Sequence, residues 1–489
     1  MKSLLCCVVL ACLYLTGCSG QAPKQSEVNN SAAEPEYESE PMSYPTSVKF
    51  AQFNVSFAHD GDPTENFAQW IGFMQMSRQQ QDDLIQQWRK PDLDEDTKKL
   101  AERVIQIRNV AAIIQAVRPD VLLLNEFNND GLGEDYAALN GFQQNYLGHA
   151  QSLNSIDGGD LQDPISYPFV QNYATNTGLA SGIDLNNNAY SAQDPNDAFG
   201  FGFYHGHYAF ALMSKYQIDT QNTRTFQTFK RKDLPDAVMP VVNVCDNSSP
   251  MPDGVKCNDN WFSPQAWQNL RLSSKNHVDA PIIIPSKNGD KVIHALLAHP
   301  TPPAFDTISD NNKYRNSEEN LFWLHYIKQG YEQTKTADFE TSFIYDDKGL
   351  RGGLRGTSFV IMGDLNADAQ IRTALDPRFN GIARLMSSPL VNQSLAQATG
   401  DFAPVSNGAA QASLTRPHPF PATRTSTFGA RADYSVPSAD LKVIDSGVFW
   451  RAEDEAGSLL FNDARIGSRG SDKEVSSDHR LVWVTVLVE

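Results

Sequence analysis

Short apolar runs along the chain predict β-strands. Residues 47–57 (SVKFAQFNVSF) alternate between apolar and polar side chains, as a strand with one buried face does. Residues 120–127 (DVLLLNEF) form a continuous apolar run, which is typical of a strand buried on both faces. Residues 280–300 are typical of a hairpin that turns at residues 287–290. The remaining strands are predicted within residues 207–216, 357–368, 440–450 and 480–488.

Two stretches between these strands have a helical pattern. Residues 64–117 contain few Gly or Pro, and Pro119 stops the pattern. Its clearest part places one apolar stripe on one helix face, made of Val104, Ile107, Val110, Ile114 and Val117. Residues 313–330 predict a second helix, with Gly330 near its end.

The order of these elements predicts the domain organisation. Strands and helices are interleaved, which indicates an α/β protein rather than a helical bundle. Residues 128–200 are rich in Asn, Asp and Gly and predict long loops with short helices. We therefore expect one catalytic domain over residues 47–489, with insertions near residues 59–100 and 130–200.

The composition excludes several classes of protein. The chain has 489 residues with 26 Phe, 7 Trp and 16 Tyr, enough bulk for a large core, so wholesale disorder is excluded. It is neither collagen-like nor a disulfide scaffold. The formal net charge of −18 argues against a protein that coats nucleic acid through a broad basic face. A nucleic-acid enzyme is still compatible with this charge, because a bound divalent cation can offset it locally.

The first residues are typical of an export signal rather than of the folded domain. Lys2 precedes an apolar stretch that is too short to remain as a membrane-spanning helix. The stretch ends in Leu15–Cys18 (LTGC), which resembles the lipobox of bacterial lipoproteins. That resemblance implies a signal peptide over residues 1–17, lipidation of Cys18 and, because Ser19 follows, sorting to the outer membrane of a Gram-negative bacterium. An ordinary signal peptide is the alternative. Residues 18–46 then predict a flexible tether.

The remaining cysteines agree with export. Only Cys245 and Cys257 follow Cys18, and they lie twelve residues apart in a loop-like stretch. In an oxidising compartment we expect them to form a disulfide. A zinc site needs more ligands than this pair offers. No other apolar run approaches 18 residues, so no further transmembrane segment is expected.

Polar side chains stand at the ends of several predicted strands. Because the ligand sites of α/β sheets gather at strand ends, we expect these residues to meet. Oxygen ligands with few thiols suit Mg²⁺, Ca²⁺ or Mn²⁺, and His supplies proton transfer near neutral pH. Taken singly, each has a structural alternative: a solvent-facing Glu, a hydrogen-bonded core His, or a GDLN turn whose Gly supplies an unusual φ. The candidates are Asn54, Glu126, His299, Asp364, Asn366, Asp433, Asp478 and His479.

The order of these motifs resembles the endonuclease/exonuclease/phosphatase superfamily, which includes DNase I-like nucleases and several phosphatases. The matching motifs are FNV, PDVLLLNE, a central strand with His, GDLNAD, a DY segment and a C-terminal SSDH, together spanning about residues 47–489. The resemblance implies a four-layer α/β sandwich, in which two packed mixed β-sheets are flanked by helices. RLSSKNHVDAPI, HPTPPAFD and RNSEENLFW are similar to a bacterial secreted branch of that superfamily.

The resemblance assigns a metal site to part of this set. Glu126 is implied as the metal ligand, Asn54 as a metal or phosphate ligand beside it, and Asp478 as a residue that assists the metal. Mg²⁺ is the implied cofactor, with Mn²⁺ or Ca²⁺ as alternatives. Position 56 is Ser, where some members carry a second acidic ligand, so a second carboxylate from the first strand is not expected.

The resemblance also assigns catalytic roles. His299 is implied to contact the scissile phosphate or protonate the leaving oxygen, and Asp364 to orient or deprotonate the attacking water. Asn366 is implied to bind phosphate. His479 is implied to act as a base or phosphate ligand, with its tautomer fixed by Asp433.

Three further residues are candidates for the substrate pocket. Lys275, His277 and Tyr434 fall within or beside the motifs, and a packing or surface role is at least as compatible with each of them.

Together these observations predict a secreted, lipid-anchored, divalent-metal-dependent phosphoesterase. No Ser, Cys or Thr nucleophile motif is apparent, so direct attack by water is the simpler mechanism. The substrate could be nucleic acid, a phospholipid head group or a small organic phosphate; the net charge favours the latter two. The expected partners are this substrate and, through the anchor, a membrane, with no protein partner. The alternative is a catalytically silent cell-surface binding protein on the same fold.

Overall fold

The computed structural model describes residues 44–58, 66–191, 194–246, 248–306, 308–336, 338–371, 375–467 and 472–488. These residues belong to one unit that spans Tyr44–Glu489. The predicted signal peptide, Cys18 and the tether as far as residue 43 lie outside the described residues.

The first sheet contains both ends of the described chain. Its strand order is β13-β14-β1-β2-β6-β5. β1 and β2 are parallel, whereas β14 and β6 run antiparallel to them, so the sheet is mixed. The strands span Ser47–Asn54 (β1), Val121–Asn125 (β2), Phe169–Asn172 (β5), Phe210–Ser214 (β6), Val443–Val448 (β13) and Val482–Leu487 (β14).

The second sheet is also mixed and has the order β12-β11-β10-β9-β7. β9 and β10 form the predicted hairpin, with Ile284 paired to Lys291 next to the turn, and β10 and β11 are parallel. The strands span Gln217–Ile218 (β7), His277–Ile284 (β9), Lys291–Ala298 (β10), Phe359–Asp364 (β11) and Asp433–Pro437 (β12), with Arg224–Thr225 (β8) pairing with β9. A separate pair joins Gln151–Ser152 (β3) to Leu161–Gln162 (β4).

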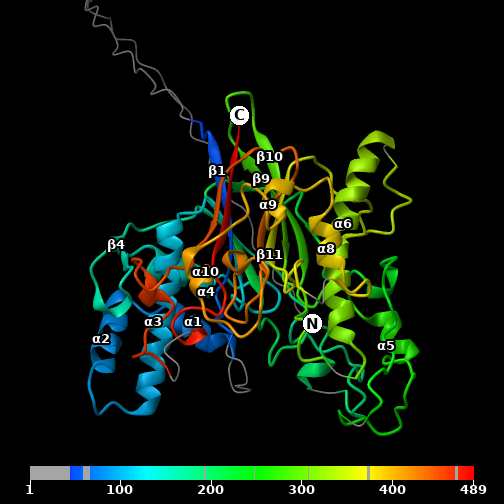
Figure 1. Ribbon diagram of the computed structural model, residues 1–489, viewed down its shortest axis with the longest axis horizontal. Coiled ribbons are helices and arrows are strands. Elements are labelled where there is room, and N and C mark those ends of the chain that lie inside the picture. The colour runs from blue at the N-terminus through cyan, green and yellow to red at the C-terminus, as the bar shows by residue number, and fades with distance from the viewer. Residues whose placement is uncertain are drawn as a thin grey trace, which may run out of the picture. The chain divides into compact units, whose positions relative to one another are not determined.

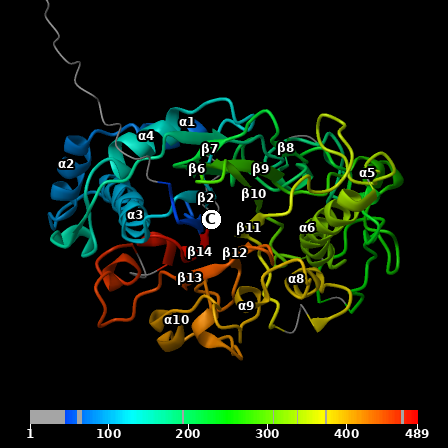
Figure 2. The same ribbon diagram turned by 90° about the horizontal axis from the view of Figure 1, so that it is seen from above.

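Helices cover the outer face of each sheet (Figures 1 and 2). α3 (Glu95–Val117) lies along the first sheet, and α6 (Asn311–Thr336) lies along the second. The result is the predicted four-layer α/β sandwich. The other helices are α1 (Phe67–Met74), α2 (Arg78–Trp88), α4 (Ala137–Phe142), α5 (Pro264–Asn269), α8 (Gly381–Met386), α9 (Gln393–Ala396) and α10 (Asn407–Gln411). No helix among the described residues is long and apolar enough to span a bilayer.

The alternation of side chains along β1 and β2 explains the layers. Val48 and Phe50 join the cluster that also contains β9, β10 and α6 residues, whereas Ala51 and Phe53 join the cluster with α3. A strand places successive side chains on opposite faces, so both faces of the first sheet are buried. The inward face of β1 continues with polar Gln52 and Asn54, and these two side chains lead into the candidate site.

Several details differ from the sequence prediction. The helical stretch 64–117 is divided into α1, α2 and α3. The loop-rich stretch 128–200 contributes β5 to the first sheet. α6 continues beyond Gly330, so this residue does not end the helix. It lets Leu354 approach instead, since a Cβ at position 330 would lie 2.4 Å from Leu354 O.

Two further features concern residues singled out in the sequence. Cys245 and Cys257 are joined by a disulfide, with their Cα atoms 5.9 Å apart. Gly363 lies inside β11, so the alternative that GDLN forms a turn is wrong. Gly is needed there because a Cβ would lie 2.1 Å from Ala298 O on the neighbouring strand.

Candidate active site

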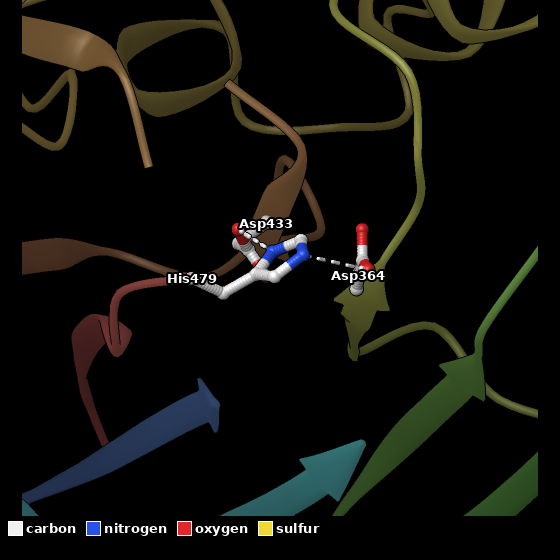
Figure 3. Close-up of side chains that lie close together, drawn as sticks. All are labelled: Asp364, Asp433 and His479. Atoms are coloured by element: carbon white, nitrogen blue, oxygen red, sulfur yellow. Dashed lines mark hydrogen bonds and ion pairs between the residues drawn. The ribbon is translucent and has the colours of Figure 1, made fainter. Parts of the chain in front are cut away.

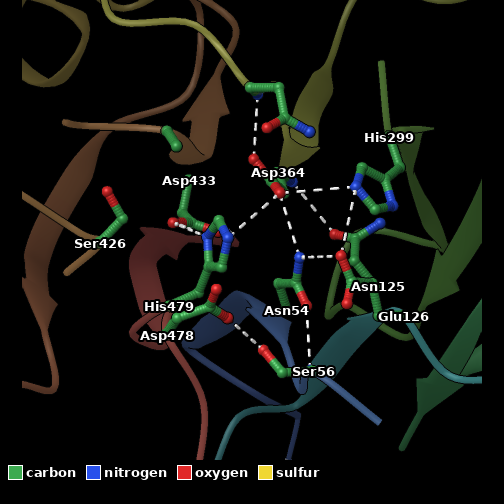
Figure 4. Close-up of polar contacts among 12 residues, drawn as sticks. Asn54, Ser56, Asn125, Glu126, His299, Asp364, Ser426, Asp433, Asp478 and His479 are labelled. Atoms are coloured by element: carbon green, nitrogen blue, oxygen red, sulfur yellow. Dashed lines mark hydrogen bonds and ion pairs between the residues drawn. The ribbon is translucent and has the colours of Figure 1, made fainter. Parts of the chain in front are cut away.

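The polar strand ends meet at one end of the two sheets (Figure 4). Asn54 and Asn125 are the last residues of β1 and β2 and are paired in register. Asp364 ends β11 and is paired with Asp433, the first residue of the antiparallel β12. Parallel neighbours end together, and an antiparallel neighbour begins where its partner ends. This topology brings together residues that are up to several hundred positions apart.

Asn54 joins the two carboxylates at the centre of the site. Its Nδ2 donates to Glu126 Oε1 and to Asp364 Oδ2, both at 3.1 Å. Its Oδ1 accepts from the Ser56 backbone N–H at 3.0 Å, which fixes the orientation of the amide. Asp364 is buried, whereas the Glu126 side chain is 18% exposed.

His479 lies between two carboxylates (Figure 3). Its Nδ1 is 2.9 Å from Asp433 Oδ2, and its Nε2 is 3.6 Å from Asp364 Oδ2. Burial alone would lower the pKa of His479, but Asp433 and Asp364 raise it well above the ordinary value. Burial and the charge of Asp364 raise the pKa of Asp433 to about 6, although His479 opposes them.

Asp364 is held in its ionised form. Burial would raise the pKa of Asp364, but His479, His299 and the hydrogen bond from Asn54 together hold it below the ordinary value. Oδ1 of Asp364 accepts from the Asn366 backbone N–H at 2.9 Å, and Asn366 Nδ2 donates to Pro300 O at 3.1 Å. Asn366 is therefore fixed beside Asp364, at the start of the loop that follows β11.

His299 lies on the opposite side of Asp364 from His479 (Figure 4). His299 Nε2 is 3.5 Å from Asp364 Oδ2 and 4.0 Å from Glu126 Oε1. Burial and the nearby Lys275 lower the pKa of His299 to about 4, so the ring is neutral near pH 7. Burial also lowers the pKa of Lys275, while the charges of Glu319, Glu126 and Asp364 oppose this shift. The ammonium group is therefore within the field of the central carboxylates.

Asp478 is held by Ser56, which stands at the position where some superfamily members carry a second acidic ligand. Ser56 Oγ donates to Asp478 Oδ1 at 2.5 Å, and it also lies 2.7 Å from Ser477 Oγ. Ser477 Oγ in turn donates to Asn54 O at 2.6 Å. The C-terminal SSDH motif is thus tied to the end of β1, and Asp478 remains half-buried.

Three residues of the site adopt left-handed backbone conformations that side chains rarely favour. The φ angles are +50° at Ser56, +57° at Glu126 and +51° at Asn366. Each follows the end of a strand, where the chain must turn while keeping its side chain at the site. Backbone strain of this kind concentrates at functional sites.

α6 positions the loops that surround the site. Glu319, buried within α6, accepts from the backbone N–H groups of Ser274 and Thr301, both at 2.6 Å. Asn316 Nδ2 donates to Thr301 O at 2.8 Å and to Leu365 O at 3.0 Å. The RNSEEN motif of the sequence therefore orders the segments that carry Lys275, His299 and Asn366.

Two predicted pocket residues lie in the interior instead. His277 Nε2 bonds to Glu319 O at 3.0 Å, and its ring packs against Phe322 and Trp323. The Tyr434 hydroxyl donates to Ala367 O at 3.0 Å, and the ring belongs to the core cluster. Their surroundings are those of packing residues.

Three contributors were absent from the sequence prediction. Gln52 Nε2 donates to Asn125 Oδ1 at 2.9 Å and to Asp433 Oδ1 at 3.0 Å, so it links both sheets. Thr425 Oγ1 donates to Asp433 Oδ2 at 2.7 Å. Gln52 and Asn125 could have been found as polar residues on an otherwise apolar strand face, whereas Thr425 lies in a loop with no such signal.

Glu126 is the site residue best suited to hold a hard cation, because its carboxylate is partly exposed. Asp364, Asp433 and His479 place one ligand atom each within 4.8 Å of the others. Both His479 nitrogens already face carboxylates, however, and the raised pKa of the ring leaves it positively charged, which opposes a cation there. Glu126 instead offers a partly exposed carboxylate, the ligand type that Mg²⁺ and Ca²⁺ prefer. Asn54 turns its Nδ2 toward Glu126 and its Oδ1 toward the Ser56 backbone, so in this structure it acts as a hydrogen-bond donor to that carboxylate.

The comparison with known families agrees with this geometry. The model of the Endonuclease/Exonuclease/phosphatase family matches residues 51–479, from β1 to His479. The chain belongs to this family. Members of the family are generally phosphoester hydrolases and commonly use divalent metals. No curated protein matches the chain in a direct comparison.

Solved structures of family members resemble the chain at a distance. An endonuclease/exonuclease/phosphatase from Beutenbergia cavernae is 14% identical, with 91% of this chain and 72% of that chain covered and a TM-score of 0.39. A mannosyl-6-phosphatase from Bacteroides thetaiotaomicron is 12% identical (91% and 100% covered, TM-score 0.36). Beta toxin from Staphylococcus aureus with bound magnesium ions is 14% identical (90% and 99% covered, TM-score 0.34).

Proposed function

We propose that this chain is a divalent-metal-dependent phosphoesterase that cleaves its substrate by direct attack of water. The supporting observation is the convergence on Asp364: this buried carboxylate contacts Asn54, His299 and His479, and Asn54 links it to Glu126. Membership of the family makes phosphate-ester hydrolysis the chemistry to expect from this arrangement. The alternative, a silent binding protein on the same fold, predicts no hydrolysis of any substrate.

Glu126 would hold the cation, with Mg²⁺ as the expected ion. Asn54 donates to the Glu126 carboxylate through Nδ2 and so positions it, and Asp478, fixed by Ser56, would assist the metal. When bound, the ion supplies positive charge that neutralises phosphate oxygens and polarises the P–O bond. The remaining steps fall to the side chains described above.

The charge states of the site suggest a division of work. Asp364, ionised, accepts a hydrogen bond or proton from the attacking water. His479, protonated and oriented by Asp433, and Lys275 stabilise negative charge that develops on the phosphoryl oxygens. Asn366 adds a neutral donor, and the neutral His299 orients Asp364 through its N–H.

The substrate class is the open part of the proposal. The net charge of −18 favours a small phosphoester or a lipid head group over a long nucleic acid, because a polyanion is repelled by an acidic surface.

We propose that the chain is an exported lipoprotein, anchored through Cys18 in the outer membrane of a Gram-negative bacterium. Detergent partitioning and mass spectrometry of wild type and Cys18→Ser would test this, since only the wild type should carry lipid.

The decisive experiment is a hydrolysis panel with the purified mature chain. Bis-p-nitrophenyl phosphate, plasmid DNA, RNA, sphingomyelin and inositol phosphates are offered with Mg²⁺, Mn²⁺, Ca²⁺ or EDTA. We expect hydrolysis of at least one substrate class, loss with EDTA, and loss in Asp364→Ala and His479→Ala. His149→Ala, at an exposed position, is the matched control and should keep full activity. Inertness toward every substrate with all three metals would overturn the proposal.

A further inference from the structure

The loop between β5 and β6 contains a second arrangement of oxygen ligands, separate from the strand ends. Asp184, Asn186 and Asn188 stand at alternate positions, and Ala189 follows with a φ of +66°. Calcium loops of the form D-x-[DN]-x-[DN]-G have this spacing, with Gly at the sixth position for the sharp turn and the backbone carbonyl of the seventh as a ligand. Here the seventh residue is Tyr190.

The side chains of this loop gather around Asp194. Asn186 Nδ2 and Asn188 Nδ2 both donate to Asp194 Oδ2, at 2.8 and 2.7 Å. The carboxylate of Asp184 accepts from the backbone N–H groups of Asn188 and Ala189, at 3.2 and 2.9 Å. The loop is thus closed on itself, with the carboxylates at its two ends brought together.

An independent observation comes from beneath the loop. Asp197 is only 2% exposed, and its Oδ1 accepts from the Leu185 backbone N–H at 2.7 Å, which places the carboxylate against the loop between Asp184 and Asn186. Its other oxygen, Oδ2, is buried and has no hydrogen-bond partner in the structure. Burial, together with the nearby negative charges of Asp194 and Asp184, raises the pKa of Asp197.

No described residue balances the negative charge of this group through an ion pair. None of the ion pairs in the described part of the chain involves Asp184, Asp194 or Asp197. A buried carboxylate oxygen without a partner is costly, and a bound cation would remove this cost.

We propose that this loop binds a calcium ion. The ligands are the carboxylates of Asp184, Asp194 and Asp197, the side-chain oxygens of Asn186 and Asn188, and the carbonyl of Tyr190. A set of oxygens from one flexible loop suits Ca²⁺, which accepts six to eight ligands, better than Mg²⁺, which demands near-octahedral geometry and keeps its waters. An affinity of about 10⁻⁵ to 10⁻³ M is expected for such a loop.

The site has a structural consequence for the rest of the molecule. The Asp197 carbonyl accepts from Ser181 N at 3.1 Å, and Gly200 N donates to Asn176 O at 3.0 Å, so the loop closes onto its own stem. Asn176 N donates to Lys275 O at 2.9 Å. Calcium would therefore stabilise the segment against which Lys275 is held, while binding itself does not depend on the proposed catalysis.

The test measures calcium binding to the full mature chain by calorimetric titration and by thermal unfolding. Wild type and Glu126→Gln should both bind Ca²⁺ at the loop and gain thermal stability from it. Asp184→Asn and Asp197→Asn should each lose this binding event, with affinity reduced by at least about 100-fold. Asp290→Asn removes the same charge from an exposed hairpin turn and should bind as wild type does.

Two further measurements keep the test decisive. Because Asp197 is buried, circular dichroism must show that Asp197→Asn folds. If that variant does not fold, Asp184→Asn and Asn188→Ala test the site instead, since Asp184 is half-buried and Asn188 is exposed. Tb³⁺ replaces Ca²⁺ as a luminescent probe, and the nearby Tyr190 and Trp261 should sensitise its emission until Ca²⁺ displaces it. The site would be refuted if Glu126→Gln and the double variant Glu126→Gln with Asp184→Asn gave equal Ca²⁺ titrations. It would also be refuted if wild type showed no response to Ca²⁺.

Discussion

Asp433 holds the ring of His479 through a 2.9 Å contact between Oδ2 and Nδ1, although the two residues are 46 positions apart in the chain. The carboxylate is itself fixed by Thr425 and Gln52, at 2.7 and 3.0 Å. His479 Nε2 is thereby directed toward Asp364. The orientation and protonation of His479 thus depend on Asp433, which contacts the ring nitrogen opposite the one that faces Asp364.

Asp433→Asn is expected to reduce hydrolysis by about 10²- to 10⁴-fold, the range attributed to positioned acid–base groups. The neutral amide keeps the size of the side chain but removes the charge that favours the protonated ring. Steady-state kinetics on the substrate found by the hydrolysis panel, with circular dichroism as a check on folding, would measure this. Asp454→Asn, at an exposed position, is the control. Activity within about twofold of wild type would show that Asp433 does not support His479.

The backbone at Glu126 gives a prediction about stability. A φ of +57° is costly for Glu or Gln, whereas Asn adopts it more readily. Both Glu126→Asn and Glu126→Gln should lose activity, but the Asn variant should have the larger free energy of unfolding, by about 1 kcal/mol. Urea denaturation of both variants measures the difference. The Asn and Gln variants of the exposed Glu134 should differ in free energy of unfolding by less than about 0.5 kcal/mol. Equal free energies of unfolding for the two variants at position 126 would contradict the assignment of strain.

Much of the fold could be predicted because several of its strands are strongly patterned. β2 is a continuous apolar run, and β9 and β10 flank a recognisable turn, so their pairing could be predicted from local sequence. β5 and β12 were less visible, because β5 has only four residues and β12 carries polar residues at Asp433 and Ser435. These strands are defined by the neighbours they pair with rather than by their own periodicity.

Only part of the candidate site could be predicted from the pattern of the strands. Asn54, Asp364 and His479 stand beside strands, and strand order decides that they meet. The contribution of Thr425 depends on a loop conformation that no local pattern encodes. Likewise, Glu319 looks like a surface acid within a helical pattern, but it is fully buried and binds two backbone N–H groups. Burial of such polar groups is decided by tertiary packing, which a single sequence does not reveal.

A buried pair away from the site makes stability depend on pH. His294 Nδ1 lies 2.6 Å from Asp279 Oδ1, and Tyr326 donates to the other oxygen at 2.6 Å. Burial opposes the charge on His294, but Asp279 raises its pKa above the ordinary 6.5. The pair therefore stabilises the fold fully below the unfolded pKa of about 6.5, and this contribution is lost as pH rises through the folded pKa.

The measurement is the difference in unfolding free energy between wild type and His294→Gln. It should be larger at about pH 6 than at about pH 9, because only the wild type loses a proton from this position over that interval. His149→Gln, at an exposed histidine, should show a nearly constant difference from wild type. A difference for position 294 that grows with pH would mean that the folded state favours neutral His294.

Two glycines in different surroundings should respond in opposite directions to the same substitution. A Cβ at Gly363 would lie 2.1 Å from Ala298 O, so Gly363→Ala must push β11 away from β10. Overpacking of this kind costs about 1–3 kcal/mol. It displaces Asp364, which ends β11, and His299, which follows β10, so activity should also fall. At Gly72, inside α1, nothing lies within 4 Å of an added Cβ, and Gly72→Ala should stabilise the chain by about 0.5–1 kcal/mol. Thermal unfolding of the two variants measures both signs, and a neutral Gly363→Ala would show that β10 and β11 can separate without loss.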